Sequence, residues 1–358
     1  MRKLDGPLQL APTFSPRPWG RESLAPIYGG DPRQTAPLPA AFRHQVLGEA
    51  WLTADAAVFR NGPVAGMTLA EAVRQYGADL LGRDSQPGRF PILAKFIFTN
   101  AWLSIQVHPD DEQARQRGRG LIGKTEMWYV TAASRGAEYL LGLKPGVTAE
   151  AIRRASRQHK IQHQLRRFRA KTAEAVFVPA GTIHALGAGL TLFEAEQNSD
   201  LTYRLDDYGR LGSDDKPRPI HLNEGLQASR LDAAPRRNLP EVELGEPFGT
   251  RRYVLACRYF AVELLALERC AQLASSPRRV ELLAVLSGSG RVENASGWWG
   301  FRSGEGWVIP PGAGGYRLIP RGKAQIFRCY VPDLDADFRK PLLRGKIRPT
   351  HIARIMFE

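Results

Sequence analysis

The chain has 358 residues, of which 43% are hydrophobic and 24% charged, and its formal net charge is +14. This composition is typical of a globular protein with a sizeable buried core, and it excludes a largely disordered chain. The length exceeds that of one ordinary domain and favours two.

Membrane insertion and disulfide bonding are both disfavoured. No run of about 18 apolar residues occurs, and the first residues contain no apolar stretch long enough for a signal peptide. We therefore expect no membrane association and a cytoplasmic location. The three cysteines, Cys257, Cys270 and Cys329, form no CxxC pair, which argues against a disulfide framework and a thiolate zinc site. A bound metal would need His, carboxylate and amide ligands.

The positive charge is spread along the chain. The arginines alternate with Pro, Gly and apolar segments, and no known nucleic-acid motif accompanies them. We expect no nucleic-acid partner, and a basic field would instead attract a phosphorylated metabolite. The densest basic segment, residues 336–358, is interpreted as a solvated C-terminal tail without an assigned function.

Few helices are indicated. Residues 1–45 are rich in Pro and Gly and predict irregular backbone over a core. A helix is predicted over residues 68–82, because Thr68 and Glu71 form a capping box ahead of regularly spaced apolar residues. A second helical insertion is predicted over residues 148–169.

Short apolar segments separated by turn residues account for most of the chain. They are FPILAKFIF, LSIQVHP, EMWYVTA, EYLLGL, AVFVPAG, LTLFEAEQ, YFAVELLAL, ELLAVLSGSGRV, GWVIPPG and QIFRCYV. Many short strands at close spacing favour a β-sandwich or barrel. A polar, Pro- and Gly-containing stretch over residues 232–249 indicates a boundary between two strand-rich regions. We predict a mainly β fold with helical insertions, with domains at residues 1–235 and 250–335.

The two regions share a sequence pattern. Residues 176–184 (VFVPAGTIH) are echoed by residues 307–315 (WVIPPGAGG), each a strand, a proline and a glycine turn. We interpret the echo as a duplication, although strand-Pro-x-Gly is also a common turn. Gly315 stands where the first copy has His184, so the second copy cannot supply a metal ligand there.

A set of N and O donors fits a catalytic metal site. Gln106 and His108 are two residues apart on a predicted strand, so their side chains project from one face. Glu126 follows eighteen residues later, and His184 ends the strand-Pro-x-Gly element. Catalytic zinc takes three or four such ligands on rigid strands. A single His on an apolar strand is more often a packed residue, so the hypothesis depends on the four together.

Four longer segments carry a family resemblance: LSIQVHPDDEQA, GKTEMWYV, VPAGTIHALGAG and EAEQNSDLTYRLDDYGR. In this order and spacing they resemble the signature segments of type I mannose-6-phosphate isomerases, which are members of the cupin superfamily. GEAWLTAD, NGPVAGMTLAEA and FPILAKFIFTN extend the resemblance over roughly residues 16–225. Weaker similarity continues through the second region.

The resemblance implies a cupin jelly-roll β-sandwich in residues 1–235 and a second cupin-like domain without metal in residues 250–335. The first would bind one Zn²⁺ per chain through Gln106, His108, Glu126 and His184. The substrate-pocket positions that match the family are Trp19, Lys95, Ser104, Lys124, Glu194, Asp200 and Arg204. Two positions depart from it: Leu186 replaces a pocket tyrosine of some members, and Leu52 replaces a usual acidic residue.

The activity that the resemblance implies is interconversion of mannose 6-phosphate and fructose 6-phosphate through an enediol(ate). A metal on the C1 and C2 oxygens would polarise the carbonyl, and a base would shuttle the proton. We expect Glu194 and Lys124 to lie closest to proton movement, Arg204 to stabilise negative charge and Lys95 to hold substrate. A cupin oxygenase, another sugar epimerase and a sugar-phosphate-binding regulator remain alternatives.

Overall fold

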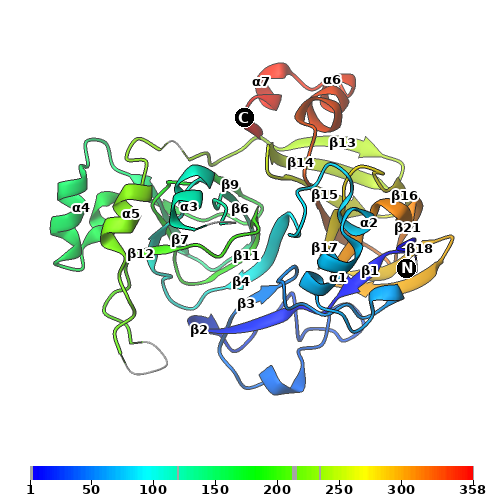
Figure 1. The fold of residues 1–358 in the computed structure, drawn as a ribbon, viewed down its shortest axis with the longest axis horizontal. Helices are drawn as coiled ribbons and strands as arrows, with labels where there is room; N and C mark the ends of the chain where they lie inside the picture. The colour runs from blue at the N-terminus through cyan, green and yellow to red at the C-terminus, as the bar shows by residue number, and fades with distance from the viewer. Residues whose placement is uncertain (1–2, 119–120, 212–215, 234, 358) are drawn as a thin grey trace.

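The computed structural model describes residues 3–118, 121–211, 216–233 and 235–357. These residues fold into four β-sheets that stack as two sandwiches side by side (Figure 1). The first sandwich, drawn from blue to green, lies beside the second, drawn from yellow to orange. The prediction of a mainly β fold with helical insertions is confirmed.

The first sandwich consists of a six-stranded and a five-stranded sheet. The six-stranded sheet has the order β2 (Thr13–Arg21), β3 (Leu47–Trp51), β4 (Ile92–Phe98), β11 (Leu190–Gln197), β6 (Glu126–Ala133) and β9 (Ala175–Val178). The five-stranded sheet has the order β12 (Tyr203–Asp206), β5 (Ile105–Val107), β10 (His184–Leu186), β7 (Glu138–Leu143) and β8 (Leu165–Arg169). Apolar side chains such as Trp128, Tyr139 and Leu192 fill the space between them.

The second sandwich consists of an eight-stranded and a four-stranded sheet. The eight-stranded sheet has the order β1 (Leu8–Leu10), β20 (Gly306–Ile309), β17 (Glu281–Ser287), β22 (Ala324–Tyr330), β15 (Ala261–Leu267), β14 (Gly249–Cys257) and β13 (Val242–Glu246), with β23 (Met356–Phe357) beside β14. The four-stranded sheet has the order β16 (Ala271–Ala274), β21 (Gly315–Pro320), β18 (Ser289–Asn294) and β19 (Gly297–Arg302).

The inner sheets of the two sandwiches pack against each other. Phe193 of the six-stranded sheet stacks on Phe327 of the eight-stranded sheet with ring centroids 4.2 Å apart and planes at 10°. Tyr129 meets the same Phe327 ring edge-on at 5.1 Å. Since burying one such aromatic side chain stabilises the fold by about 1.5–3 kcal/mol, this shared core holds the sandwiches together.

The strands follow the predicted division of the chain with one departure. Strand β1 comes from the N-terminal region but pairs with β20, in the register Leu8 with Val308. The N-terminus therefore lies beside the second sandwich (Figure 1). The division into domains at residues 1–235 and 250–335 stays a prediction.

The first predicted helix is divided in two. Helix α1 (Leu69–Tyr76) begins with the expected capping box, in which Thr68 and Glu71 cap each other's backbone N–H. Gly77 adopts φ +47°, which interrupts the helix, and α2 (Ala78–Leu81) follows. The prediction of one helix over residues 68–82 is therefore wrong at Gly77.

The second predicted helix, over residues 148–169, is also shorter than expected. Helix α4 (Ala149–Ser156) is followed by the 3-10 helix η3 (Ile161–Gln164) and strand β8. His159 adopts φ +52°, which no α-helix allows. In β8 Leu165 is buried, and beyond it the partly buried Arg166 and Phe168 alternate with exposed arginines; the strand pairs with β7, so strand pairing takes over from the polar helical pattern.

The C-terminal segment, predicted as a solvated basic tail over residues 336–358, is folded. It forms the π-helix η5 (Leu334–Arg339), α6 (Lys340–Arg344), α7 (Pro349–Ile352) and β23. Its basic side chains are largely exposed, but Phe338 and Leu342 between them are fully buried. Apolar burial therefore fixes this segment to the second sandwich.

The remaining helices are short connections: η1 (Ala40–Phe42), η2 (Gly62–Val64), α3 (Asp111–Arg117), α5 (Leu222–Ala228) and η4 (Pro311–Ala313). Across the described ranges, none of the helices combines the length and apolar character needed to cross a bilayer. The two similar segments also occupy similar positions in the fold. His184 begins β10, which follows β9 of the facing sheet, and Gly315 begins β21, which follows β20 of the facing sheet.

Candidate active site

A cavity of about 320 Å³ opens between the two sheets of the first sandwich. Ten of the eleven predicted site residues line it: Trp19, Lys95, Ser104, Gln106, Lys124, Glu126, His184, Glu194, Asp200 and Arg204. The eleventh, His108, lies behind Glu126, with its Nε2 atom 3.4 Å from Oε2 of that carboxylate. The fold thus brings all eleven residues together.

Strand register explains this convergence. In the five-stranded sheet Gln106 of β5 lies opposite both His184 of β10 and Arg204 of β12. In the six-stranded sheet Glu194 of β11 lies opposite Lys95 of β4. Because side chains alternate between the faces of a strand, every second residue of β11 points into the same interior, so Glu196 joins Glu194 there.

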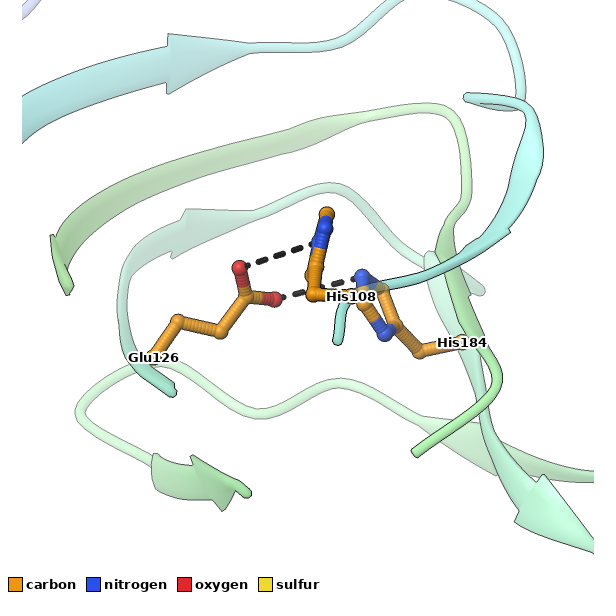
Figure 2. A group of neighbouring side chains, drawn as sticks. All are labelled: His108, Glu126 and His184. Atoms are coloured by element: carbon orange, nitrogen blue, oxygen red, sulfur yellow. Dashed lines mark ion pairs between the residues drawn. The ribbon is translucent and has the colours of Figure 1, made fainter. Parts of the chain in front are cut away.

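Three buried side chains form a compact donor cluster, His108, Glu126 and His184 (Figure 2). One donor atom from each residue lies within 4.8 Å of the others. The two carboxylate oxygens of Glu126 face one imidazole each, at 3.4 Å from Nε2 of His108 and 3.2 Å from Nε2 of His184. The cluster therefore presents two imidazoles and one carboxylate to a common point.

The far side of each imidazole is held by the backbone. Nδ1 of His108 lies 3.0 Å from the Leu201 carbonyl, and Nδ1 of His184 lies 2.9 Å from the Thr182 carbonyl. A carbonyl can only accept, so each Nδ1 carries a proton, and in the neutral ring Nε2 then has a free lone pair. Burial, together with the nearby Lys124 charge, lowers the pKa of His108 well below its usual value, so this ring is a neutral donor.

Gln106 completes the set. Its Nε2 lies 3.2 Å from Nε2 of His184, where the amide N–H can donate to the imidazole lone pair. Turning the amide by half a rotation would place its oxygen toward the same point. The side chain can therefore serve either as a hydrogen-bond donor to His184 or as a fourth oxygen ligand.

Beside these donors lies a buried cluster of lysines and carboxyl groups. Lys95 Nζ is 3.0 Å from both Glu194 and Glu196, and Lys124 Nζ is 3.0 Å from Glu196 and 3.3 Å from Glu126. All five side chains are buried. Two ammonium groups thus face three carboxyl groups, so the ionisation of one carboxyl group is disfavoured.

The pKa directions follow from this imbalance. Burial raises the pKa of Glu194, but the two lysines outweigh it and hold the pKa at about 2. Burial and the neighbouring carboxylates raise the pKa of Glu196 well above its usual value. Burial lowers the pKa of Lys95 and Lys124, but the facing carboxylates more than reverse this effect, so both remain protonated. Glu194 is therefore held as a carboxylate, and each lysine as an ammonium.

The donor chemistry fits a divalent metal such as zinc. Nε2 of His108 and Oε2 of Glu126 are buried and make no hydrogen bond within the described part of the chain, and Oε2 has the Lys124 ammonium 3.3 Å away as an ion-pair partner. Leaving buried polar atoms without a hydrogen bond is costly, and a cation at their common point would satisfy them. The same cation would also add positive charge beside the three carboxyl groups and so favour the ionised form of Glu196. Nitrogen and oxygen donors of this kind suit zinc.

Three arginines line the cavity, and the sequence predicted only one of them, Arg204. Arg17 pairs with Glu49 at 2.7 Å, and Arg218 pairs with Asp207 at 3.2 Å. Nη1 of Arg204 donates to the Pro219 carbonyl, while its Nε has no hydrogen-bond partner among the described residues. Burial first, and then the charge of Arg218, lowers the pKa of Arg204. A group of cations that repel one another is ready to receive an anion.

Besides Arg17 and Arg218, sequence reasoning missed the buried Glu196, which pairs with Lys95 and Lys124 beside the cavity. Glu196 had an available signal, because its two-residue spacing from Glu194 on a predicted strand places both on one face. Glu49 and Trp128 also line the cavity. Of the two departures from the family pattern, Leu186 lines the cavity, while Leu52 is buried in the core between the sandwiches.

The fold and the donor cluster together define a cupin-type β-sandwich protein with a candidate metal-binding site. The family model described as "Phosphomannose isomerase type I, catalytic domain" matches residues 8–138. A curated relative, the mannose-6-phosphate isomerase ManA of Bacillus subtilis (strain 168), is 33% identical over 316 residues, which cover 87% of this chain and 95% of the relative. The chain therefore belongs to the type I mannose-6-phosphate isomerase family.

Solved structures agree with this assignment. The crystal structure of a mannose 6-phosphate isomerase from Bacillus subtilis superposes with a TM-score of 0.79 at 26% identity, covering 90% of this chain and 99% of that one. A second structure, described as a zinc-bound mannose 6-phosphate isomerase, gives a TM-score of 0.69 at 16% identity over 91% of this chain and 99% of that one. The second likeness supports the fold.

Proposed function

We propose that this protein is a zinc-dependent isomerase that interconverts mannose 6-phosphate and fructose 6-phosphate. The observation that carries the proposal is the position of the His108, Glu126 and His184 cluster on the wall of a cavity that also holds paired acids and bases. Membership of the family supports the same substrate, and a zinc-bound structure with this fold supports the metal.

The ligands would be His108, Glu126 and His184, with Gln106 as the fourth, and one zinc per chain. When bound, zinc would polarise the substrate carbonyl and stabilise the enediolate oxygens. The carbonyl hydrogen bonds at both Nδ1 atoms would keep the Nε2 lone pairs aimed at the ion.

Proton transfer falls to the cluster beside the ligands. Glu194 is held as a carboxylate, so it is available to take the proton from C2 of mannose 6-phosphate and return it to C1. Lys124 is held as an ammonium, so it is available to donate a hydrogen bond or a proton to the adjacent substrate oxygen. The enediol(ate) is the intermediate of this exchange.

The remaining cavity residues bind and orient the substrate. We assign this role to Trp19, Lys95, Ser104 and Asp200. Arg204 has a free Nε and lies among other cations, so it suits an oxygen that gains negative charge during the reaction.

The decisive test combines metal analysis with turnover. Elemental analysis should find about one zinc per chain, and an assay coupled to fructose 6-phosphate formation should show activity that chelators abolish. His184→Ala should lose both zinc and activity, while His351→Ala in α7 of the second sandwich should lose neither. Stoichiometric iron, or full activity without metal, would contradict zinc dependence. Bound zinc without turnover would favour a sugar-phosphate-binding regulator.

A further inference from the structure

The loop between β14 and β15 of the second sandwich contacts the first sandwich close to the proposed metal ligands. Tyr259 lies in this loop, and its hydroxyl donates a 2.8 Å hydrogen bond to Oδ2 of Asp111. Asp111 begins helix α3, three residues after His108. A residue of the second sandwich therefore touches the segment that follows a proposed zinc ligand.

Asp111 joins two further segments that lead to the site. Its Oδ1 accepts hydrogen bonds from the Gly123 backbone N–H and from the Gln197 side chain, both at 2.8 Å. Gln197 in turn accepts a 2.8 Å hydrogen bond from the Thr125 backbone N–H. Gly123 and Thr125 lie three residues and one residue before Glu126, and Gln197 follows Glu196. One carboxylate thus ties together the chain next to His108, the chain next to Glu126 and the end of β11.

The contact between these segments is close. A Cβ atom added to Gly123 would lie 2.7 Å from the backbone of Asp110 and Asp111, so no larger residue fits there without movement. The Lys124 backbone N–H also donates to the Pro109 carbonyl at 3.0 Å. Burial opposes ionisation of Asp111, but the hydrogen bonds from Tyr259, Gly123 and Gln197 outweigh it and lower the pKa, so both oxygens accept.

We propose that Tyr259 is a positioning residue, through which the second sandwich fixes the Asp111 carboxylate and thereby the spacing between His108 and Glu126. The inference rests on the proposed function for the identity of the metal and substrate. It gives the second sandwich a role at the site although it contributes none of the described cavity-lining residues. The hydroxyl also accepts a hydrogen bond from Arg258, whose guanidinium lies 3.8 Å from Oδ2 of Asp111, so Asp111 is its contact with the first sandwich.

A double-mutant cycle tests this proposal on the full chain. Asp111→Ala should weaken zinc affinity about tenfold, the lower end of what loss of an orienting partner costs. Tyr259→Phe keeps the ring and removes the hydroxyl, so it should weaken zinc affinity several-fold and lower kcat at saturating zinc with little change in KM. In the double variant Tyr259→Phe should add no further loss, because its partner is already gone.

Tyr316→Phe is the matched control. Its buried hydroxyl donates to Glu281 at 3.3 Å entirely within the second sandwich, so its removal should leave zinc affinity unchanged. Unchanged zinc affinity and kcat in Tyr259→Phe, with only a lower urea midpoint, would overturn the proposal in favour of a purely structural contact. An equal loss of zinc affinity in Tyr316→Phe would overturn it as well. Since zinc affinity is measured without turnover, failure of the isomerase assay would not be confused with failure of this inference.

Discussion

Lys95→Met should cost far more stability than removal of an ordinary ion pair. Lys95 is 3% exposed and lies 3.0 Å from both Glu194 and Glu196. Without it, Lys124 alone would face three buried carboxyl groups. Breaking a buried pair by removing one partner costs about 3–5 kcal/mol, which lowers the folding equilibrium constant on the order of 10²- to 10⁴-fold. We expect a loss of this size in the free energy of unfolding of the metal-free protein.

The measurement is urea unfolding in the presence of a chelator, followed by tryptophan fluorescence. Lys323→Met is the matched control, because Lys323 contacts Glu268 at 2.7 Å but is 84% exposed, and such pairs contribute about 1 kcal/mol or less. The double variant Lys95→Met/Glu196→Gln also removes the carboxyl group that loses its Lys95 partner, so it should recover most of the loss. If Lys95→Met cost no more than Lys323→Met, or if Glu196→Gln gave no recovery, the assigned charge imbalance would be wrong.

Three further outcomes are expected. Arg204→Ala should lower kcat on the order of 10²-fold and leave zinc content unchanged, as steady-state kinetics and metal analysis can check; a defect in KM alone would assign Arg204 to phosphate binding. Phe327→Ala should destabilise the protein by about 3–5 kcal/mol in urea unfolding, because it empties the shared core against Phe193, and a loss below about 1 kcal/mol would argue against that core. Removing zinc by chelation should lower the thermal midpoint, and adding zinc back should restore it, whereas an unchanged midpoint would argue against binding at His108, Glu126 and His184.

Strand β11 shows what the sequence can and cannot predict. The segment LTLFEAEQ is buried on both faces, so its apolar content predicts a strand but not its neighbours. One face, with Glu194 and Glu196, lines the first sandwich, while the other, with Phe193, packs on the second. The resemblance identified Glu194 as a pocket residue. Glu196 required the period-two alternation to be combined with knowledge of which face is the interior.

Other features depended on contacts between distant segments. Arg17 and Arg218 reach the cavity because β2 and the segment after β12 lie at its edge, a tertiary arrangement that no local pattern reports. Strand β8 has a helix-compatible polar sequence and becomes a strand by pairing with β7. The C-terminal basic segment likewise folds because Phe338 and Leu342 find a core contributed by β14 and β22.

The interior of the second sandwich also contains buried charges, but they balance. Glu263 and Glu281 are fully buried and share Arg328, at 3.3 Å and 2.6 Å. Arg251 adds a second guanidinium 3.1 Å from Glu263. Two buried carboxylates therefore face two guanidinium groups, of which Arg251 also pairs with the partly exposed Glu246 at 3.0 Å, and the Tyr330 hydroxyl donates a further hydrogen bond to Glu263 at 2.5 Å. The electrostatics of these described residues give no reason for an additional cation.

The interior of the first sandwich differs from that of the second in its buried charged groups and in the metal-ligand atoms that it offers. Its two buried lysines face three carboxyl groups, and its two imidazoles keep their Nε2 lone pairs directed at Glu126. At the start of the strand that returns from the proline turn, the first sandwich has His184 and the second has Gly315, which has no side chain to donate. A β-sandwich interior accepts a divalent ion when it offers lone pairs and holds more carboxyl groups than cationic side chains. This argument favours metal in the first sandwich, since among the described residues both groups of three possible ligands lie there.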